Sequence, residues 1–449
     1  MARRQHWLLY VLAAILFQLA RIIWTRLQKL KWFIDGTRTR IEQRRQAKFY
    51  NQCAQLLDIR LRHSMESLTL PPSDKYFITT HSRFVSPEYV LKDNVSIYAL
   101  TNNEAVFIEV PEGVEEWRLS VNAFHKIAQF ENAVRIVKIP LNAFNKLSRT
   151  LRKQSQPKII LGYSSARSGS TLMCSIFEKT ECCVSFSEPG LIVDPFLVNK
   201  KCKDTKEEDK YKDILVSTVT MLCKPRSHAV KAYFLKMLTE MAWLDTNTVV
   251  ETLKMHFTDV HFIYLYRNIP NVVNSIIKLQ PELRYMKIVN LLLSVLGHNV
   301  RKKVKVLDFF EKEEQTRNSE IIDLLLKFLY HPQCLYLQFL IYVITKNHNV
   351  YLSIHQQKPG VVKSIKYEDL LSDPDATIRD VFSHCGLPSE LVIEAKTALE
   401  HDSQANSVIS RETLSKNKPR KPECVIKDAL DRICKHYNVA GYYTDLRLP

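Results

Sequence analysis

From residue 158 onward, short apolar runs of strand length alternate with segments whose apolar positions follow a helical period. The strand-like runs are Ile159–Tyr163, Cys183–Phe186, Ala229–Phe234, Val260–Tyr266 and Val361–Tyr367. The helical patterns are Leu172–Lys179, Val272–Leu279, Leu283–Leu296, Glu320–Tyr330 and Pro374–His384. This alternation predicts an α/β domain over 151–449, with a central parallel sheet flanked by helices. In such sheets, ligands bind beyond the carboxyl ends of the strands.

Residues 75–150 have a different pattern, in which apolar and polar positions alternate over short stretches such as Val95–Ala99. We expect short strands here, forming a small accessory β region packed on the main domain. The preceding residues 25–74 are basic and polar, and we predict that they form a largely helical stem. The charged run 199–213 is predicted to be a solvated loop.

The N-terminus carries an apolar segment from Trp7 to Ala20, interrupted only by Gln18 and followed by Arg21. Its uncharged part is shorter than the ~20 residues that span a bilayer comfortably. An uncleaved signal-anchor over 1–24, a cleaved signal peptide, and a buried or interfacial helix all fit this pattern. We favour the anchor, because Gln18 stands where a signal peptide cut after Ala20 needs a small residue. More Lys and Arg follow the segment than precede it, so by the positive-inside rule the charge flanks disagree with an anchor that places its C-terminal side in the lumen.

The composition is that of a globular protein, with a strong basic excess. The 449 residues are 46% hydrophobic and 25% charged, and the formal net charge is +17. Much of the excess lies within residues 1–60, beside the apolar segment, which suggests contact with anionic lipid headgroups or acidic polymers. No recognisable nucleic-acid-binding motif accompanies the charge, so we do not expect a nucleic-acid partner. The 10 cysteines form no paired C-x-x-C array, which argues against a zinc site.

Residues 158–171, with the sequence KIILGYSSARSGST, carry the most informative motif. An apolar run breaks into a loop of small residues, and a helical pattern follows. The free N–H groups and the helix dipole at such a junction favour an anion, Gly169 lets the backbone approach it, and Arg167 adds a cationic fork. An ordinary strand-to-helix turn is the alternative for this loop taken alone.

A second candidate anion site follows the run that ends at Tyr266. Arg267 comes directly after this run, Pro270 suits the first turn of a helix, and Ser275 lies one to two turns further along. Arg267 and Ser275 could therefore converge on one anion through charge-assisted hydrogen bonds. A strand-end salt bridge with an unrelated helix serine is the alternative.

Taken together, these motifs resemble those of the phosphoadenosine-phosphosulfate (PAPS)-dependent sulfotransferases, especially the Golgi membrane carbohydrate type, over about 158–390. Arg167-Ser168-Gly169-Ser170-Thr171 matches the family's R-S-G-[ST]-[ST] loop, which holds the 5′-phosphosulfate. Arg267 and Ser275 match the pair that holds the 3′-phosphate. Residues 366–374 resemble the family's Y-E-D-L segment, in which the acids are mostly structural. The resemblance implies a P-loop-like sulfotransferase fold with PAPS as co-substrate.

A Walker-type nucleotide kinase is the main rival for the first loop. It needs G-x-x-x-x-G-K-[ST], with the lysine on the phosphates and a hydroxyl on Mg²⁺. Here Gly162 is out of register and no lysine follows Gly169. The rival motif therefore fits poorly, and no metal is implied.

Glu188 is the candidate general base. It lies in Ser185–Pro189 at the end of the next strand-like run, and Golgi sulfotransferases place a base Glu at a similar distance beyond the loop. An ion pair with a surface lysine, or a helix cap, is the alternative. Lys231 is a candidate for contacting the sulfate, although a solvated strand-end lysine is equally compatible.

The chain also departs from the family pattern. Asn268 stands where the family usually has Asp, which puts the internal pairing of that loop in doubt. A C-terminal R-K-G-type adenosine loop is absent, and residues 402–420 are a candidate replacement.

The resemblance implies an enzyme in the Golgi membrane with a lumenal catalytic domain, held by its N-terminal segment. The expected acceptor is a hydroxyl of a glycan or glycoprotein. A tyrosine-directed protein sulfotransferase uses the same parts, and a catalytically silent nucleotide- or glycan-binding protein of this fold is a further alternative. The sequon Asn94-Val95-Ser96 gives weak support for a lumenal location.

Overall fold

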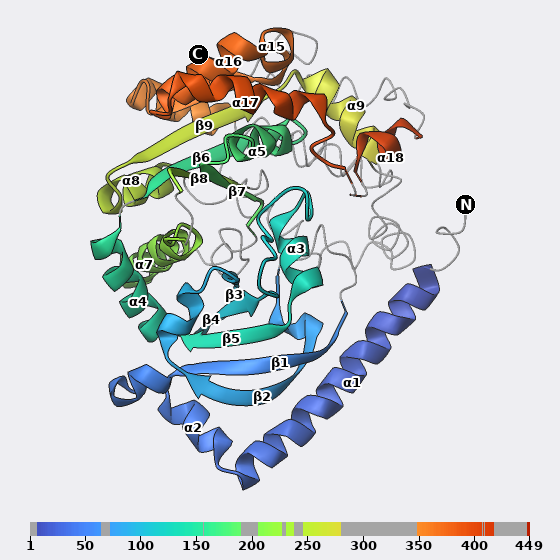
Figure 1. The fold of residues 1–449 in the computed structure, drawn as a ribbon, viewed down its shortest axis with the longest axis vertical. Helices are drawn as coiled ribbons and strands as arrows, with labels where there is room; N and C mark the ends of the chain where they lie inside the picture. The colour runs from blue at the N-terminus through green and yellow to red at the C-terminus, as the bar shows by residue number, and fades with distance from the viewer. Residues whose placement is uncertain are drawn as a thin grey trace, which may run out of the picture. The chain divides into compact units, whose positions relative to one another are not determined.

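The computed structural model describes most of the chain (Figure 1). The described residues are 7–63, 72–155, 157–189, 205–226, 230–237, 246–279, 348–405, 407, 409–416 and 447–449. The chain divides into two compact units, which we describe separately. The first comprises 1–162, 171–261 and 390–404, and the second comprises 163–170, 262–389 and 405–449. The units do not follow the boundaries expected from the sequence, because the division between residues 162 and 163 falls within strand β6 (Lys158–Ser164).

The first unit contains an antiparallel sheet of five strands in the order β2-β1-β5-β4-β3. The strands are β1 (Ala54–Arg62), β2 (Phe77–Val85), β3 (Val95–Leu100), β4 (Glu104–Glu109) and β5 (Arg135–Pro140). The strands expected within 75–150 are therefore present. The prediction of a helical stem is wrong for residues 54–62, because these residues form β1. This strand pairs with both β2 and β5 and buries Ala54–Leu57 at its start.

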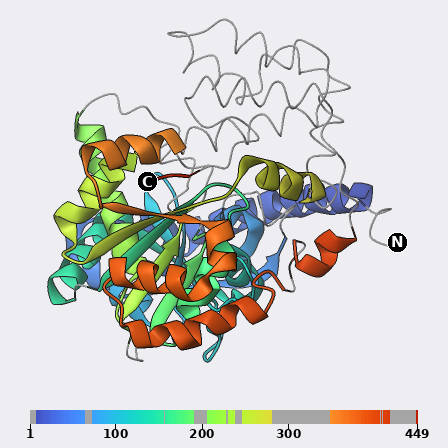
Figure 2. The same ribbon diagram turned by 90° about the horizontal axis from the view of Figure 1, so that it is seen from above.

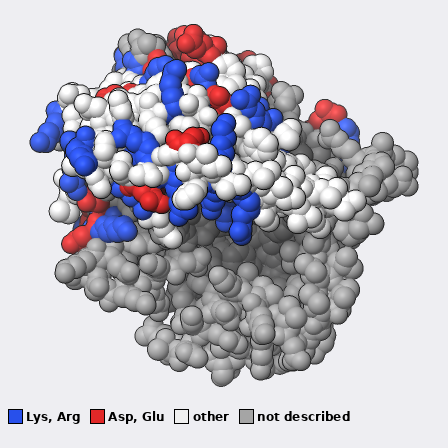
Figure 3. Space-filling view, turned by 90° about the horizontal axis from the view of Figure 1, so that it is seen from below, with Lys and Arg blue, Asp and Glu red and all other residues white. Residues whose placement is uncertain are grey.

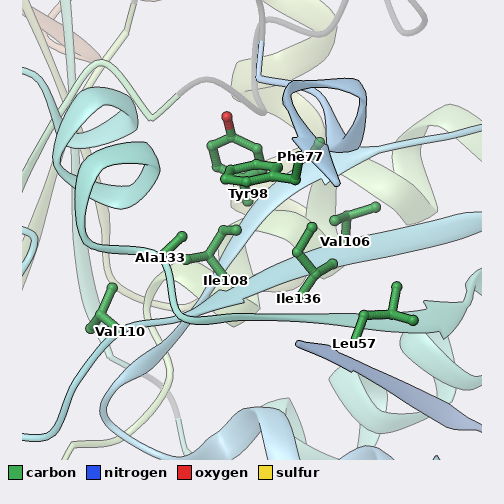
Figure 4. Close-up of a cluster of buried hydrophobic side chains, with 9 residues drawn as sticks. Leu57, Phe77, Tyr98, Val106, Ile108, Val110, Ala133 and Ile136 are labelled. Atoms are coloured by element: carbon green, nitrogen blue, oxygen red, sulfur yellow. The ribbon is translucent and has the colours of Figure 1, made fainter. Parts of the chain in front are cut away.

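An apolar cluster fills one side of this sheet (Figure 4). Phe77, Tyr98, Ile108 and Ile136 are buried in it, and the partly buried Trp32 packs against it. Because these side chains come from β2, β3, β4 and β5, the cluster joins strands that are distant along the chain.

Several helices belong to the same unit. They are α2 (Thr37–Gln43), α3 (His125–Asn132), α4 (Leu141–Gln154), α7 (Thr205–Leu222) and α8 (Thr246–His256), with 3-10 turns at Ala47–Gln52, Asp74–Tyr76 and Pro87–Leu91. The prediction of a solvated loop over 199–213 is wrong from residue 205 onward, because α7 begins there. The charges stabilise this helix, since Lys212 pairs with Glu208 one turn away and Asp213 pairs with Arg149 of α4.

The N-terminal apolar segment is part of a longer helix, α1 (Trp7–Ile34), which runs beside β2 (Figure 1). Trp24 Nε1 and Gln28 Nε2 both donate to the carbonyl of Thr79. The opposite face exposes a stripe of apolar side chains: Leu12, Ile15, Leu16, Leu19, Ile22, Ile23, Leu27, Leu30, Phe33 and Ile34. Among the described residues, no helix has both the length and the apolar character required to cross a bilayer.

The second sheet also has five strands, in the order β10-β9-β6-β8-β7. They are β6 (Lys158–Ser164), β7 (Cys183–Ser187), β8 (Ala232–Lys236), β9 (Val260–Tyr266) and β10 (Val362–Lys366). The pairs β6–β8, β7–β8 and β9–β10 are parallel, as expected. β6 lies at the centre, so the chain adds strands first on one side of it and then on the other. This order creates a topological switch point beside β6, where ligands bind in such sheets.

The helices that accompany these strands largely match the expected pattern. They are α5 (Ser170–Glu178) after β6, α9 (Ile269–Leu279) after β9, and α15 (Tyr367–Ser372) and α16 (Pro374–His384) after β10 (orange in Figure 2). Short elements follow at Ser389–Leu391, α17 (Val392–Lys396), Thr397–Glu400 and α18 (Arg411–Ser415). The expected helices over 283–296 and 320–330 lie outside the described residues.

The basic excess is dispersed on the face drawn in Figure 3, where acidic side chains lie between the lysines and arginines. In the described part of the chain, the free cysteines are Cys53, Cys174, Cys182, Cys183, Cys223 and Cys385.

Candidate functional site

The loop after β6 is held in an unusual backbone conformation. Arg167 has a φ of 58° and Gly169 a φ of 83°, and only glycine adopts such values at no cost. The hydroxyl of Ser168 is buried and donates to the carbonyls of Ser165 and Leu265. Ser168 therefore fixes the shape of the loop with its side chain, which leaves its backbone N–H, rather than its hydroxyl, for a ligand.

The second unit brings the two predicted anion motifs together. Arg167 Nε donates to Ser275 Oγ over 2.9 Å, and Arg267 Nη1 donates to the carbonyl of Arg167 over 3.3 Å. Ser275 was expected to act with Arg267, and it contacts Arg167 instead. The three residues nevertheless form one cluster, built from the loop after β6, the end of β9 and helix α9.

Tyr367, at the start of α15, packs against both parts of this cluster. A Cβ atom on Gly169 would overlap the Tyr367 ring, so residue 169 must be glycine both for space and for its φ. The Arg267 guanidinium lies 4.6 Å from the centroid of the same ring. This arrangement orders the loop and the arginine with respect to each other.

Glu368 provides an acidic partner for the loop after β9, where Asn268 takes the place of the Asp that is usual in the family. Its Oε1 accepts from Asn271 Nδ2 over 2.8 Å and from the backbone N–H of Asn268 over 3.4 Å, and it lies 3.8 Å from Arg267 Nε. A carboxylate at this position also suits the positive end of α9. The acid of the Y-E-D-L segment is therefore structural, as the resemblance implied.

A basic cavity of about 440 Å³ adjoins this cluster within the second unit. It is lined by Arg267, Asn271, Asn274, Ser275, Lys278, Arg411, Leu414 and Ser415. Arg267 Nε is buried without a hydrogen-bond partner among the described residues, which leaves a cationic donor for an anion. Arg411 lies within the stretch suggested as a substitute for the adenosine loop, whereas Lys418 and Arg420 lie outside the described residues.

In the first unit, Glu188 follows β7 and is paired with a lysine. Its Oε1 lies 2.7 Å from Lys236 Nζ, and the two side chains are 15% and 5% exposed. Glu188 has a φ of 57°, a left-handed conformation that a non-glycine residue adopts only when its surroundings enforce it. Such strain is concentrated at functional positions. The carboxylate is thus held at the carboxyl end of its strand, where the fold places ligands.

Lys236 also contacts the start of α5, because its Nζ donates to Thr171 Oγ1 over 2.9 Å. Gln404 Nε2 donates to the same oxygen over 3.4 Å. Since Thr171 Oγ1 accepts both bonds, its own proton remains for a further acceptor. Cys174, on the next turn of α5, is fully buried, which raises its pKa to about 11 and keeps the thiol neutral.

The structure does not bring Lys231 to this cluster. Lys231 precedes β8 and donates its backbone N–H to the carbonyl of Cys182, at the amino-terminal edge of the sheet. Lys236 ends the same strand, in register with Gly162 of β6 and Ser187 of β7. Lys236 was not predicted as a site residue because the strand was expected to end at Phe234. The signal was present, since lysines flank the apolar run and only the second lies at its carboxyl end.

The two clusters differ in the chemistry that they allow. The Arg167, Arg267 and Ser275 cluster offers cations and hydroxyl groups suited to a phosphate. The Glu188 and Lys236 pair offers a carboxylate that can accept a proton beside a fixed cation. Within the described ranges, no group of three or more His, Cys, Asp or Glu side chains is arranged to hold a metal ion.

A family model of the sulfotransferase domain matches residues 156–436. The match includes the loop after β6, Glu188, Lys236, Arg267, Ser275 and Tyr367. No curated protein shows significant sequence similarity to the chain.

Among solved structures, the sulfotransferase domain from the curacin biosynthetic pathway is 17% identical, with coverage of 66% of this chain and 100% of that chain and a TM-score of 0.33. Sulfotransferase STF9 from Mycobacterium avium is 12% identical, with coverage of 69% and 82% and a TM-score of 0.37. Retinol dehydratase, in a complex with retinol and PAP, is 13% identical, with coverage of 70% and 89% and a TM-score of 0.30. Similarities this distant add no detail beyond the family match.

Proposed function

The chain belongs to the family of PAPS-dependent sulfotransferases, and on that premise we propose that Glu188 is the general base for sulfuryl transfer to an acceptor hydroxyl. The observation that carries the proposal is the Glu188 carboxylate, held in a left-handed conformation and paired with Lys236 at 2.7 Å. A base must be deprotonated and fixed in direction before the acceptor arrives. The ion pair with Lys236 and the left-handed backbone both fix the position of this carboxylate.

The loop residues are suited to the charge that develops during transfer. When bound, PAPS supplies the sulfuryl group and carries anionic oxygens on its leaving side. Arg167, the loop N–H groups, Ser170 and the free proton of Thr171 are donors for those oxygens. Glu188 accepts the proton of the acceptor hydroxyl, and Lys236 contributes fixed positive charge. This scheme assigns Lys236 the role that the sequence suggested for Lys231.

The 3′-phosphate of the nucleotide is assigned to the Arg267 cluster. Three features support this assignment: Arg267 Nε makes no hydrogen bond among the described residues and has only the Glu368 carboxylate at 3.8 Å, Ser275 offers its hydroxyl, and a basic cavity adjoins both. Phosphate recognition by an arginine with a neighbouring hydroxyl needs no metal ion.

Radiolabelled transfer from [³⁵S]PAPS tests the reaction. We expect the purified full-length chain to label a hydroxyl acceptor and Glu188→Gln to lose that activity while still binding 3′,5′-adenosine diphosphate. Binding of the nucleotide without transfer to any acceptor would instead support a catalytically silent binding protein. Full activity of Glu188→Gln would remove this residue from the role of base.

We propose a carbohydrate acceptor on the resemblance to Golgi sulfotransferases. A panel of glycans and tyrosine peptides in the same assay tests it. Labelling restricted to glycans supports the proposal, whereas labelling of tyrosine peptides alone would reassign the acceptor class.

We also propose that α1 attaches the protein to a membrane and that the catalytic domain lies in the Golgi lumen. The exposed apolar stripe of α1, interspersed with Arg26, Lys29 and Lys31, supports contact with anionic lipid. The amide nitrogen of Asn94 donates to the carbonyl of Val110, so glycosylation would have to precede folding of this segment. A glycosidase-sensitive mass shift that Asn94→Gln abolishes would establish the lumenal location, and reactivity of the domain with cytosolic labelling reagents would refute it.

A further inference from the structure

Lys236 has a third neighbour, and it comes from the accessory β region. Besides Glu188 and Thr171, Lys236 Nζ faces the ring of Phe124, whose centroid lies 5.6 Å away. Phe124 directly precedes α3, in the segment that connects β4 to β5. Its side chain belongs to the buried core and is only 3% exposed.

The position of Phe124 is fixed by its own backbone. Its N–H donates to Asn122 Oδ1 over 3.0 Å, and its carbonyl accepts from Ile127 and Ala128 in the first turn of α3. The next residue, His125, packs its ring against Phe186 with a centroid separation of 4.9 Å. Phe186 lies in β7, two residues before Glu188. One segment of the accessory β region therefore contacts both Lys236 and the strand that leads to Glu188.

These contacts define the direction of the Lys236 ammonium group. A lysine this deeply buried is costly unless each direction of its ammonium meets a suitable partner. The carboxylate, the threonine oxygen and the π face of the aromatic ring are such partners. An aliphatic side chain in place of Phe124 would fill similar space but would not attract the cation. Lys236 could then turn away from Thr171 and Glu188.

We infer that Phe124 is a positioning residue for sulfuryl transfer, which acts by holding Lys236 against Glu188 and Thr171. The inference rests on the proposed roles of Glu188 and Lys236. It makes the accessory β region part of the catalytic apparatus, since removal of the ring disturbs the reaction without touching either substrate.

Rate measurements on the full-length chain test the inference. Phe124→Leu removes the ring at similar volume, Phe124→Met does so with a more adaptable side chain, and Phe124→Tyr retains the π face. Phe107→Leu is the matched control, because Phe107 is buried in β4 of the same region and its ring packs against Phe144 rather than Lys236. We expect kcat to fall about tenfold in the Leu and Met variants and to stay within about threefold in the Tyr variant and the control. KM for PAPS should stay within about twofold throughout.

A second readout follows the lysine itself. Reductive methylation, followed by mass spectrometry, should modify Lys236 about tenfold faster in Phe124→Leu than in the wild-type chain or in Phe107→Leu. Equal kcat in Phe124→Leu and Phe107→Leu, or faster labelling without a fall in kcat, would overturn the inference. Absence of transfer by the unmodified chain would instead refute the proposed function, so the two failures are distinguishable.

Discussion

The two parts of the loop after β6 hold charge in opposite ways. Up to Ser170, the loop belongs to the second unit, where Arg167 Nε donates to the Ser275 hydroxyl, Arg267 Nη1 donates to a backbone carbonyl, and the Glu368 carboxylate lies 3.8 Å from Arg267 Nε. From Thr171 onward it belongs to the first unit, where Lys236 is neutralised by Glu188 at 2.7 Å. The first cluster contains two arginines with one carboxylate at 3.8 Å, whereas the second is a close ion pair of one lysine and one carboxylate.

This difference indicates two tasks. Hydrogen bonds to a hydroxyl and to a carbonyl leave the charge of these arginines in place, which suits a strong anion such as a nucleotide phosphate. A carboxylate beside a buried lysine is poorly suited to bind an anion, and its position suits the proposed role of proton acceptor. The basic cavity beside the arginine cluster is lined by three cationic side chains, those of Arg267, Lys278 and Arg411, which further increases its positive charge.

The strongest test of the comparison is Glu188→Gln. The amide preserves shape but cannot accept the proton, so we expect the transfer rate to fall about 100- to 10 000-fold. Affinity for 3′,5′-adenosine diphosphate, measured by calorimetry, should change less than about twofold. Glu394→Gln, an exposed change in α17, is the control and should retain full activity. A comparable loss of nucleotide affinity in Glu188→Gln would contradict the division of tasks.

Arg267→Ala tests the other cluster. Because a hydrogen bond to a charged group contributes about 1.5–3 kcal/mol, we expect the affinity for 3′,5′-adenosine diphosphate to fall about 10- to 100-fold. Binding of adenosine 5′-monophosphate, which lacks the 3′-phosphate, should be nearly unchanged in the same calorimetric assay. Arg379→Ala, an exposed change in α16, serves as the control. Equal losses for both nucleotides would sink the 3′-phosphate assignment.

Gly169→Ala tests the link between the loop and Tyr367. The added methyl group overlaps the Tyr367 ring and meets a φ of 83°, so the change should cost about 1–3 kcal/mol in thermal or denaturant unfolding. We expect the strained loop of Gly169→Ala to bind the nucleotide more weakly as well. When Gly169→Ala is combined with Tyr367→Leu, the added methyl group no longer overlaps an aromatic ring, so part of the lost nucleotide affinity should return. If the second change brings no recovery, the ring does not set the loop conformation.

Lys224 sharpens the comparison, as a buried lysine that is held mainly by backbone. Its Nζ donates to the carbonyls of Val90, Lys92 and Val95, and burial lowers its pKa to about 7 from the ordinary 10.5. Between these two values the unfolded chain binds more protons at this position than the folded chain. The free energy of unfolding therefore rises with pH, by at most about 1.4 kcal/mol per pH unit.

Lys224→Met should remove this rise, which urea unfolding between about pH 7 and pH 9 would measure. Lys153→Met, an exposed change in α4, should keep it. Equal slopes in the two variants would show that Lys224 is not responsible for the pH dependence.

The sequence itself determined the elements and the order of the motifs. The β6 loop, β9 with Arg267, and β10 with the Y-E-D-L segment all lie where the apolar runs predicted them. This succeeded because buried parallel strands are continuous apolar runs, and their carboxyl ends bear the polar residues. The position of Glu188 at the carboxyl end of β7 was predictable for the same reason, since it directly follows such a run.

The tertiary structure alone decided which side chains meet. Ser275 contacts Arg167 rather than acting only with Arg267, Ser168 turns its hydroxyl inward, and Lys236 replaces Lys231 beside Glu188. The bounds of the strand decide which lysine lies there, because the predicted run ended at Phe234 whereas β8 continues to Lys236 at its carboxyl end. Phe124 was beyond reach for a different reason: more than 100 residues separate it from Lys236, and no local pattern encodes a contact at that distance.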